Sequence, residues 1–74
     1  MYTELTKGQK LVGLTFNPSG DDQVTKFKQA CANAIDILLE EQKANTTAEK
    51  FVSLAIDSIL TGQMFGVKAQ TWKE

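Results

Sequence analysis

The sequence predicts an all-α protein: an antiparallel hairpin of two helices, preceded by a non-helical N-terminal arm. Two long segments, residues 21–44 and 47–70, carry apolar side chains at spacings of three and four residues, the period of a helix with one buried face. A short polar break separates them, and helices joined so closely run antiparallel. The chain has 74 residues. A single domain this small buries little surface, so we expect copies to associate into a compact homo-oligomer.

Residues 1–20 are expected to form the non-helical arm. Glycine and proline are costly inside helices, and most of them gather in this segment: Gly8, Gly13, Pro18 and Gly20. The stretch 11–16 carries four large apolar side chains and should lie against another surface. The stretch 17–22 has the composition of a turn that leads into a helix, with Ser19, Asp21 or Asp22 as the N-cap.

The first long helix is expected over residues 21–44. Its apolar stripe follows a heptad-like spacing and is widened by two further aliphatic residues; the stripe consists of Val24, Phe27, Cys31, Ala34 and Leu38, with Ile35 and Leu39 beside it. The pattern breaks at residues 45–47. Thr46 or Thr47 is expected to cap the next helix, with Glu49 placed for a reciprocal contact.

The second long helix, residues 47–70, has more apolar residues than one buried face requires. One stripe, containing Val52, Ala55, Ile56 and Ile59, can face the first helix, and another, containing Leu60, Met64 and Val67, points elsewhere. A two-helix hairpin covers one stripe per helix, so the excess predicts self-association as a four-helix bundle or a larger ring. Trp72 lies close to the end and needs a surface to pack on, because chain ends fray unless they are docked.

Composition excludes several classes of function. Eight lysines, no arginine and nine acidic residues give a net charge of −1, without the basic excess of proteins that coat DNA or RNA. The chain has no histidine and one cysteine, which removes histidine-based catalysis, most zinc sites and any intrachain disulfide. The acidic cluster Asp36, Glu40 and Glu41 is interpreted as a solvated helix face. We therefore predict no enzymatic activity, cofactor or metal; an acidic metal site shared between subunits is the enzymatic alternative.

The sequence also bears on location. No apolar run approaches the roughly 18 to 20 residues that a membrane span needs. The first residues lack the basic-then-apolar order of a secretory signal peptide. A lone cysteine is typical of reducing compartments. We expect a soluble intracellular protein with no membrane partner.

The most informative constellation lies at the entrance to the first helix. Phe16 and Asn17 precede the helix, and Lys26 and Lys28 follow one to two turns inside it. An aromatic ring can stack on a nucleobase, and a lysine can meet a phosphate as a point charge. In the structural alternative, Phe16 packs on the first helical turns and Lys28 is simply solvated. The two aspartates at this helix end oppose anion binding.

These segments resemble a known family. The resemblance rests on residues 11–19 (LVGLTFNPS), on Lys28 and residues 34–36 (AID) in the following helix, and on residues 63–72 (QMFGVKAQTW). Together they resemble the small helical-hairpin proteins of phages that include the anti-CBASS cyclic-nucleotide sponges, in particular the short version carried by T-even phages. The usual pattern in the last segment is Gln-Met-(aromatic)-Ala-Val-Lys-Ala. Gly66 departs from that alanine, which should weaken the helix by about 1 kcal/mol.

The resemblance implies a fold and a function. Such proteins assemble as compact hexamers of helical hairpins. They hold cyclic dinucleotides such as cGAMP between protomers without cleaving them, and some members also bind cyclic trinucleotides. Sequestering these second messengers in the host cytoplasm blocks host CBASS anti-phage immunity.

The resemblance also implies site residues. Phe16 matches the aromatic residue that stacks on the bases, and Lys28 matches the lysine that contacts phosphate. Family members often carry tyrosine at the aromatic position, so Phe16 would keep the stacking face without the hydroxyl. Ser58 and Thr61 are candidates for a separate trinucleotide pocket, although arginine is absent from this chain. The competing hypothesis is an oligomeric helical module that docks a host protein on the apolar excess of residues 47–70.

Overall fold

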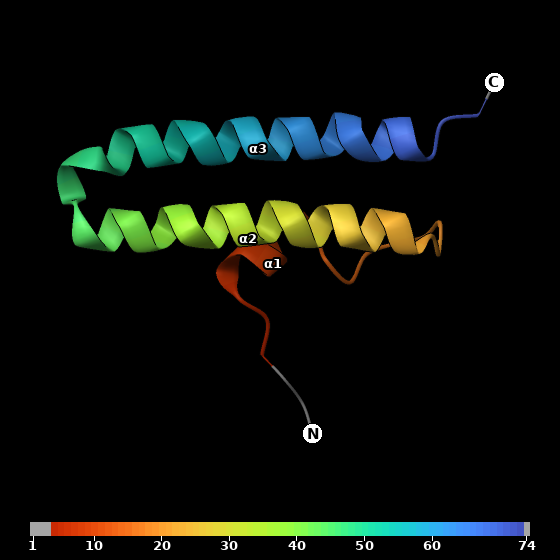
Figure 1. Ribbon diagram of the computed structural model, residues 1–74, viewed down its shortest axis with the longest axis horizontal. Coiled ribbons are helices and arrows are strands. Elements are labelled where there is room, and N and C mark those ends of the chain that lie inside the picture. The colour runs from red at the N-terminus through yellow and green to blue at the C-terminus, as the bar shows by residue number, and fades with distance from the viewer. Residues whose placement is uncertain (1–3, 74) are drawn as a thin grey trace.

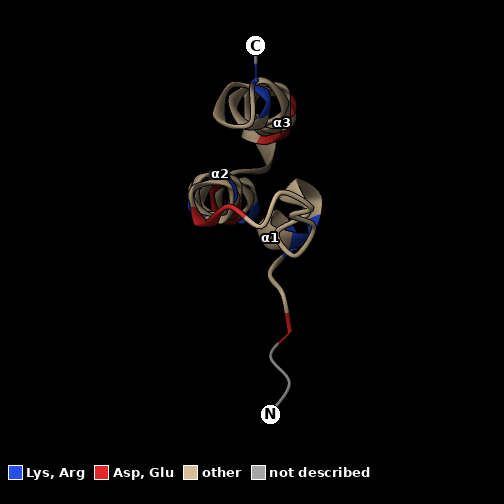
Figure 2. Cartoon of the chain, turned by 90° about the vertical axis from the view of Figure 1, so that its right-hand side faces the viewer, with Lys and Arg blue, Asp and Glu red and all other residues tan. Residues whose placement is uncertain are grey.

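The computed structural model describes residues 4–73, which form three α-helices and one short 3-10 turn (Figure 1). The elements are α1 (Lys7–Val12), α2 (Asp22–Ala44), η1 (Thr46–Ala48) and α3 (Glu49–Gln70). Helices α2 and α3 lie side by side and antiparallel, and α1 packs against α2 (Figures 1 and 2). The predicted all-helical fold is confirmed. Within residues 4–73, no helix combines the length and apolarity needed to cross a membrane.

The prediction of a non-helical arm is wrong for residues 7–12, which form α1. The Thr6 and Gln9 side chains cap its start reciprocally: Gln9 N–H donates to Thr6 Oγ1 over 3.1 Å, and Thr6 N–H donates to Gln9 Oε1 over 2.9 Å. This capping box satisfies two amides that a helix start leaves unpaired. Gly13 ends the helix at φ 66°, and Gly13 and Leu14 donate to the carbonyls of the last turn. Gly13 therefore terminates a helix instead of preventing one.

Gly8 lies where α1 crosses α2. Its N–H donates to Asp36 Oδ1 over 2.8 Å, and a Cβ at this position would overlap the carbonyl oxygen of Ala32. The missing side chain lets the two backbones approach, which offsets the low helix propensity of glycine. Val12, one turn further along α1, is buried in the same contact.

The start of α2 follows the prediction closely. A turn at 17–20, with Gly20 at φ 68°, leads to Asp21, whose side chain accepts a hydrogen bond from Gln23 N–H over 2.9 Å. Asp21 is thus the N-cap, and α2 begins at Asp22.

The predicted cap of the second long helix is wrong. Asn45 takes the capping role, because its Oδ1 accepts from Thr47 N–H over 3.2 Å and from Thr47 Oγ1 over 2.6 Å. These bonds hold residues 46–48 in a 3-10 turn. Helix α3 therefore begins at Glu49 and not at residue 47, and no side chain caps its start. Thr46 and Thr47 therefore belong to the connection.

Helix α2 buries a wider surface than one stripe. Val24, Lys28, Ala32 and Ile35 are buried, whereas Phe27, Ala34 and Leu38 of the expected stripe are only half-buried. The physical reason is that α2 has a neighbour on two sides, α1 and α3. The core cluster of Val12, Ala32 and Ile35 is completed by half-buried residues from all three helices: Leu14, Cys31, Leu39, Ile56, Ile59 and Leu60.

Helix α3 packs on α2 along one side and leaves the other side open. Val52 is its one buried residue within the part of the chain described, and Leu60 packs on the core, contrary to the expectation that it points elsewhere. The open side of α3 exposes large apolar side chains, which we call the outer face: Phe51, Leu54, Met64 and Phe65. The Cα trace is only 12 Å thick along its shortest axis, about one helix diameter.

Candidate functional site

The candidate site is a hollow of about 400 Å³ where three parts of the chain meet. The α1–α2 loop forms one wall, the first turns of α2 form the floor, and the last turns of α3 close the other side. The residues that line it are Phe16, Asn17, Pro18, Ser19, Val24, Lys28, Val67 and Thr71. Three of the predicted site residues, Phe16, Asn17 and Lys28, are therefore brought together.

The loop wall is fixed by its own polar side chains. Asn17 Nδ2 donates to the Asp21 carbonyl over 2.8 Å and to Thr25 Oγ1 over 2.9 Å. Ser19 Oγ donates to Asn17 Oδ1 over 2.6 Å and accepts from Asp21 N–H over 3.2 Å. Both amide protons of Asn17 are used in these bonds. Asn17 thus holds the loop in shape and presents Phe16, and is not itself a free donor for a ligand.

Lys28 is the most unusual side chain in the hollow. It is only 6% exposed, and its ammonium donates to the carbonyl of Gly13 over 3.2 Å and to the carbonyl of Phe16. An ammonium has three N–H groups, so one remains beyond these two bonds. Among residues 4–73, the single ion pair within 4.0 Å joins Lys43 and Glu40 on the surface. Lys28 is therefore a buried cation that meets neutral carbonyl oxygens within the described chain.

The alternative in which Lys28 is simply solvated is wrong. The chain reverses after α1, and this reversal brings two backbone carbonyls over the lysine. They belong to Gly13 and Phe16, which precede Lys28 by 15 and 12 residues in the sequence. Those carbonyls replace water as partners of the ammonium, as a buried charge requires. The lysine thereby ties the end of α1 to α2.

Phe16 contributes an open aromatic face. Its side chain is 70% exposed, so the alternative in which it packs on the first helical turns is also wrong. The Lys28 Nζ lies 5.6 Å from the centre of its ring, within range of a cation–π contact. The result is a solvent-facing ring positioned beside a buried positive charge.

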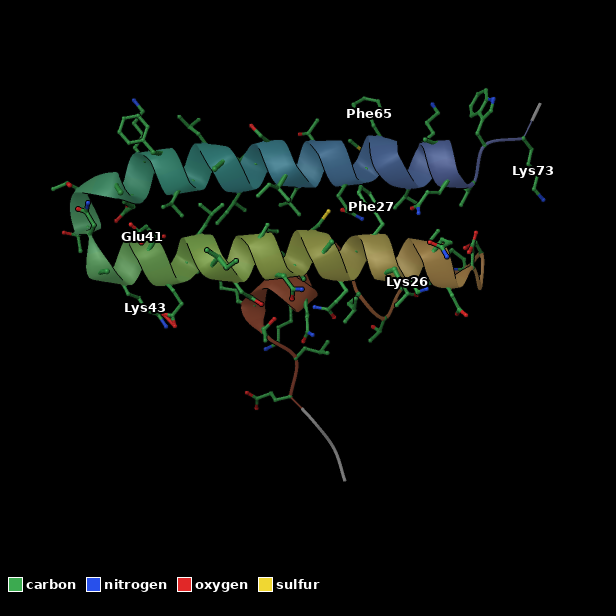
Figure 3. The ribbon with its side chains drawn as sticks, viewed as in Figure 1. Lys26, Phe27, Glu41, Lys43, Phe65 and Lys73 are labelled. Carbon is green, nitrogen blue, oxygen red and sulfur yellow. The ribbon has the colours of Figure 1, made fainter. Side chains whose placement is uncertain are left out.

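The remaining predicted residues lie elsewhere. Lys26 lies on α2 (Figure 3), where it is exposed. It is not among the residues that line the hollow. Ser58 and Thr61 are exposed on α3 outside the hollow, and Thr61 Oγ1 donates to the Asp57 carbonyl over 3.0 Å. The contribution of α3 comes instead from Val67 and Thr71. They were not predicted, because the antiparallel pairing alone does not say which side chains of the last turns face the start of α2.

A larger hollow of about 650 Å³ lies between the start of α1 and the α2–α3 connection. Its wall alternates in charge: Lys7 and Lys43 stand among Asp36, Glu40 and Glu49. It has no aromatic ring, and Asp36 is engaged with Gly8. Mixed charge without a stacking surface favours the smaller hollow as the ligand site.

The cysteine lies away from this hollow. Cys31 is half-buried beside the core, and burial raises the pKa of its thiol, which keeps it protonated at neutral pH. Across residues 4–73, no three His, Cys, Asp or Glu side chains gather in a way that could hold a metal ion. Cys31 does not line the hollow that holds Phe16 and Lys28.

Comparison with protein-family models, with curated proteins and with solved structures gives no match for this chain.

Proposed function

We propose that this protein binds cyclic dinucleotide second messengers such as cGAMP without cleaving them, in the host cytoplasm, and so withholds them from the effectors of CBASS anti-phage immunity. The observation that carries the proposal is the exposed Phe16 ring beside the buried Lys28 ammonium. A nucleotide needs both partners, because its base stacks on a ring and its phosphate requires a positive charge.

The charge of Lys28 supports this assignment. No carboxylate lies within 4.0 Å of it among the described residues, so an entering phosphate would supply its counter-charge. Attraction between charges is stronger at a partly desolvated site than in bulk water. The two carbonyl bonds hold the ammonium in place, and a pre-organised group loses little conformational entropy on binding.

The lining favours binding over turnover. Around Lys28 and Phe16 it offers hydroxyls, an amide and apolar groups, none of which is a carboxylate, thiol or imidazole that could act as a general base or nucleophile. A small, mostly apolar hollow with a few convergent polar groups is typical of ligand-binding sites. The ligand is therefore expected to leave the protein chemically unchanged.

Self-association is part of the proposal, and we expect a hexamer. The chain is one helix layer thick, and the outer face of α3 leaves Phe51, Leu54, Met64 and Phe65 exposed. Gly62 lies on the same helix, and a Cβ there would meet nothing within 4 Å. A glycine in mid-helix costs about 1 kcal/mol relative to alanine. The compensation is close approach of a second copy at this position.

Cyclic trinucleotide binding remains a prediction of the same kind. Ser58 and Thr61 are exposed on α3 between the apolar ends of the outer face. A pocket that uses them needs a second wall, which a neighbouring copy would provide.

The test is a titration with a panel of cyclic di- and trinucleotides, followed by melting temperature and native mass spectrometry. A ligand at one hundred times its Kd should add about 2.7 kcal/mol of stability by mass action. Phe16→Ala should abolish the shift, while Ile37→Ala, a control at an equally exposed apolar side chain on α2 outside the hollow and the outer face, should not. The proposal is overturned if no cyclic nucleotide binds, if Phe16→Ala binds as tightly as the parent, or if the recovered ligand has been cleaved.

Lys28 needs a variant that separates binding from folding. Its removal leaves the carbonyls of Gly13 and Phe16 without their donor, so Lys28→Met, which keeps the apolar stem, is preferred. Circular dichroism first establishes that α2 and α3 are intact. A folded Lys28→Met that binds cGAMP as tightly as the parent would show that this lysine has no role toward phosphate.

The alternative function is docking of a host protein on the outer face of α3, which its exposed apolar side chains favour. It predicts no response to any cyclic nucleotide and one stoichiometric protein partner that is lost on Phe65→Asp. That combination of results would replace the present proposal.

A further inference from the structure

Helix α1 is hydrogen-bonded to side chains of α2 at both of its ends (Figures 1 and 2). At its start, the Gly8 N–H, which the helix itself leaves unpaired, donates to Asp36 Oδ1 over 2.8 Å. At its end, the Gly13 carbonyl accepts from Lys28 Nζ over 3.2 Å. Asp36 follows Lys28 by eight residues, which is about 12 Å along a helix axis. The short helix therefore spans two anchors that α2 holds at a fixed distance.

Between these anchors, α1 makes few other contacts that could hold it. Gln9 Nε2 donates to Gln29 Oε1 over 3.1 Å, and this bond joins two neutral amides. Val12 is buried against α2, whereas Leu11 is 43% exposed. A helix of six residues does not persist on its own in water. The position of α1 thus depends on its contacts with α2, and the two polar anchors fix its ends.

The Lys28 anchor is also part of the candidate site. The same ammonium donates to the Phe16 carbonyl and lies 5.6 Å from the centre of the Phe16 ring. If α1 leaves α2, the Gly13 carbonyl leaves the ammonium, and both the lysine and the loop that carries Phe16 regain conformational freedom. A ligand must then order these groups again, at a cost in affinity. Docked α1 therefore keeps the site in its binding geometry.

We infer that Asp36 is a positioning residue for ligand binding: it keeps α1 docked, and docked α1 keeps the Gly13 carbonyl on Lys28. This inference rests on the proposed function. Asp36 is half-buried and is not among the residues that line the hollow, so it acts without touching the ligand. Coupling between two sites is reciprocal. A ligand that binds better when α1 is docked must therefore also hold α1 more firmly on α2.

Calorimetric titration with cGAMP measures the effect on affinity. Asp36→Ala removes the acceptor of the Gly8 N–H and should weaken binding about fivefold or more, as for two coupled sites. Asp36→Asn keeps an acceptor oxygen in the same place and should retain most of the affinity. Glu40→Ala is the matched control, because it removes an exposed carboxylate one turn further along α2, and it should bind as tightly as the parent. Circular dichroism first establishes that α2 and α3 are intact in each variant.

Hydrogen exchange of the parent measures the reciprocal effect and needs no variant. The amides of Lys10 and Leu14 donate to carbonyls of Thr6 and Gln9, and they exchange when α1 opens locally. Saturating cGAMP should slow both amides about fivefold or more. The amide of Ala48, which lies in the α2–α3 connection at the other end of the hairpin, should exchange at an unchanged rate. A purely structural role of Asp36 would leave the exchange of α1 independent of the ligand.

The outcomes separate this inference from the proposed function. Equal affinity of cGAMP for the parent and for a folded Asp36→Ala variant would overturn the positioning role and leave the proposed function in place. So would exchange of Lys10 and Leu14 that cGAMP leaves unchanged or accelerates. A parent that binds no cyclic nucleotide would overturn both.

Discussion

The ring of Phe27 points from α2 toward α3 (Figure 3) and lies against Gly66, where a Cβ would overlap it. Glycine in a helix lowers stability by about 1 kcal/mol relative to alanine. Here the absent side chain makes room for an aromatic ring between the helices. Gly66, which takes the place of the alanine in the pattern Gln-Met-(aromatic)-Ala-Val-Lys-Ala, therefore makes space for the Phe27 ring of the same chain. Packing, not local propensity, explains the residue.

Replacing Gly66 with alanine should lower the free energy of unfolding by about 1–3 kcal/mol, as expected when a well-packed contact is overfilled. Gly62→Ala is the matched control, because the same substitution four residues earlier meets open space within one chain and should raise the stability of the unassociated chain by up to about 1 kcal/mol. Urea denaturation of each variant at low protein concentration measures both effects. Adding Phe27→Leu should recover most of the loss in Gly66→Ala. A Gly66→Ala variant at least as stable as the parent would contradict this explanation.

Helix α1 is short and depends on its contact with α2. Six residues are too few to form a stable helix alone, so the capping box at Thr6 and the Gly8 N–H bond to Asp36 must hold it. Its last residues also deliver the Gly13 carbonyl to Lys28. The segment that the composition predicted to be part of a non-helical arm thus positions the ammonium of the candidate site.

Gly8→Ala should release α1 from α2, because the new methyl group would overlap the Ala32 carbonyl and the Asp36 carboxylate. Hydrogen exchange is expected to accelerate at the amides of Lys10 and Leu14, while amides in the middle of α2 and α3 keep their protection. Lys10→Ala, at an exposed position on the same helix, should change neither. Unaltered protection of α1 in Gly8→Ala would show that the close crossing is not what holds the helix.

The helices of the described chain lie in a single layer, about one helix thick, with few fully buried side chains. Its core cluster contains Val12, Ala32 and Ile35, while the outer face of α3 stays in solvent. A chain of this size buries too little apolar surface to be robust alone. Covering the outer face with a second copy would remove the exposed rings from water and add the wall that a shared pocket needs.

Sedimentation velocity at micromolar concentration should find the parent as an oligomer and Phe65→Asp as a smaller species, because a carboxylate cannot be buried without a partner. Ile37→Asp is the control: Ile37 is equally exposed, at 69%, but lies on α2, and this variant should stay assembled. A folded, monomeric parent would overturn the proposed self-association.

Local patterns predicted the parts of the fold that depend on neighbouring residues. Apolar spacing placed α2 and α3 within two residues of their observed ends, because apolar residues recur in each segment with the 3.6-residue period of a helix. The same local logic failed for α1, where Gly8 and Gly13 counted against a helix. Gly8 is present for contact with another element and Gly13 for the helix end, and neither purpose is visible in the propensity of glycine alone.

The candidate site divides in the same way. Phe16 and Lys28 could be chosen from their chemistry and their position at a helix entrance, since ring and charge are properties of the residues themselves. That Lys28 is buried under the carbonyls of Gly13 and Phe16, and that Val67 and Thr71 close the hollow, depends on distant segments meeting. Residue types and periodicity limit which chemistry this chain can offer. The packing of α1 and α3 on the two sides of α2 fixes where those residues meet. The sequence did not predict this packing in detail, because contacts between remote segments leave no local pattern.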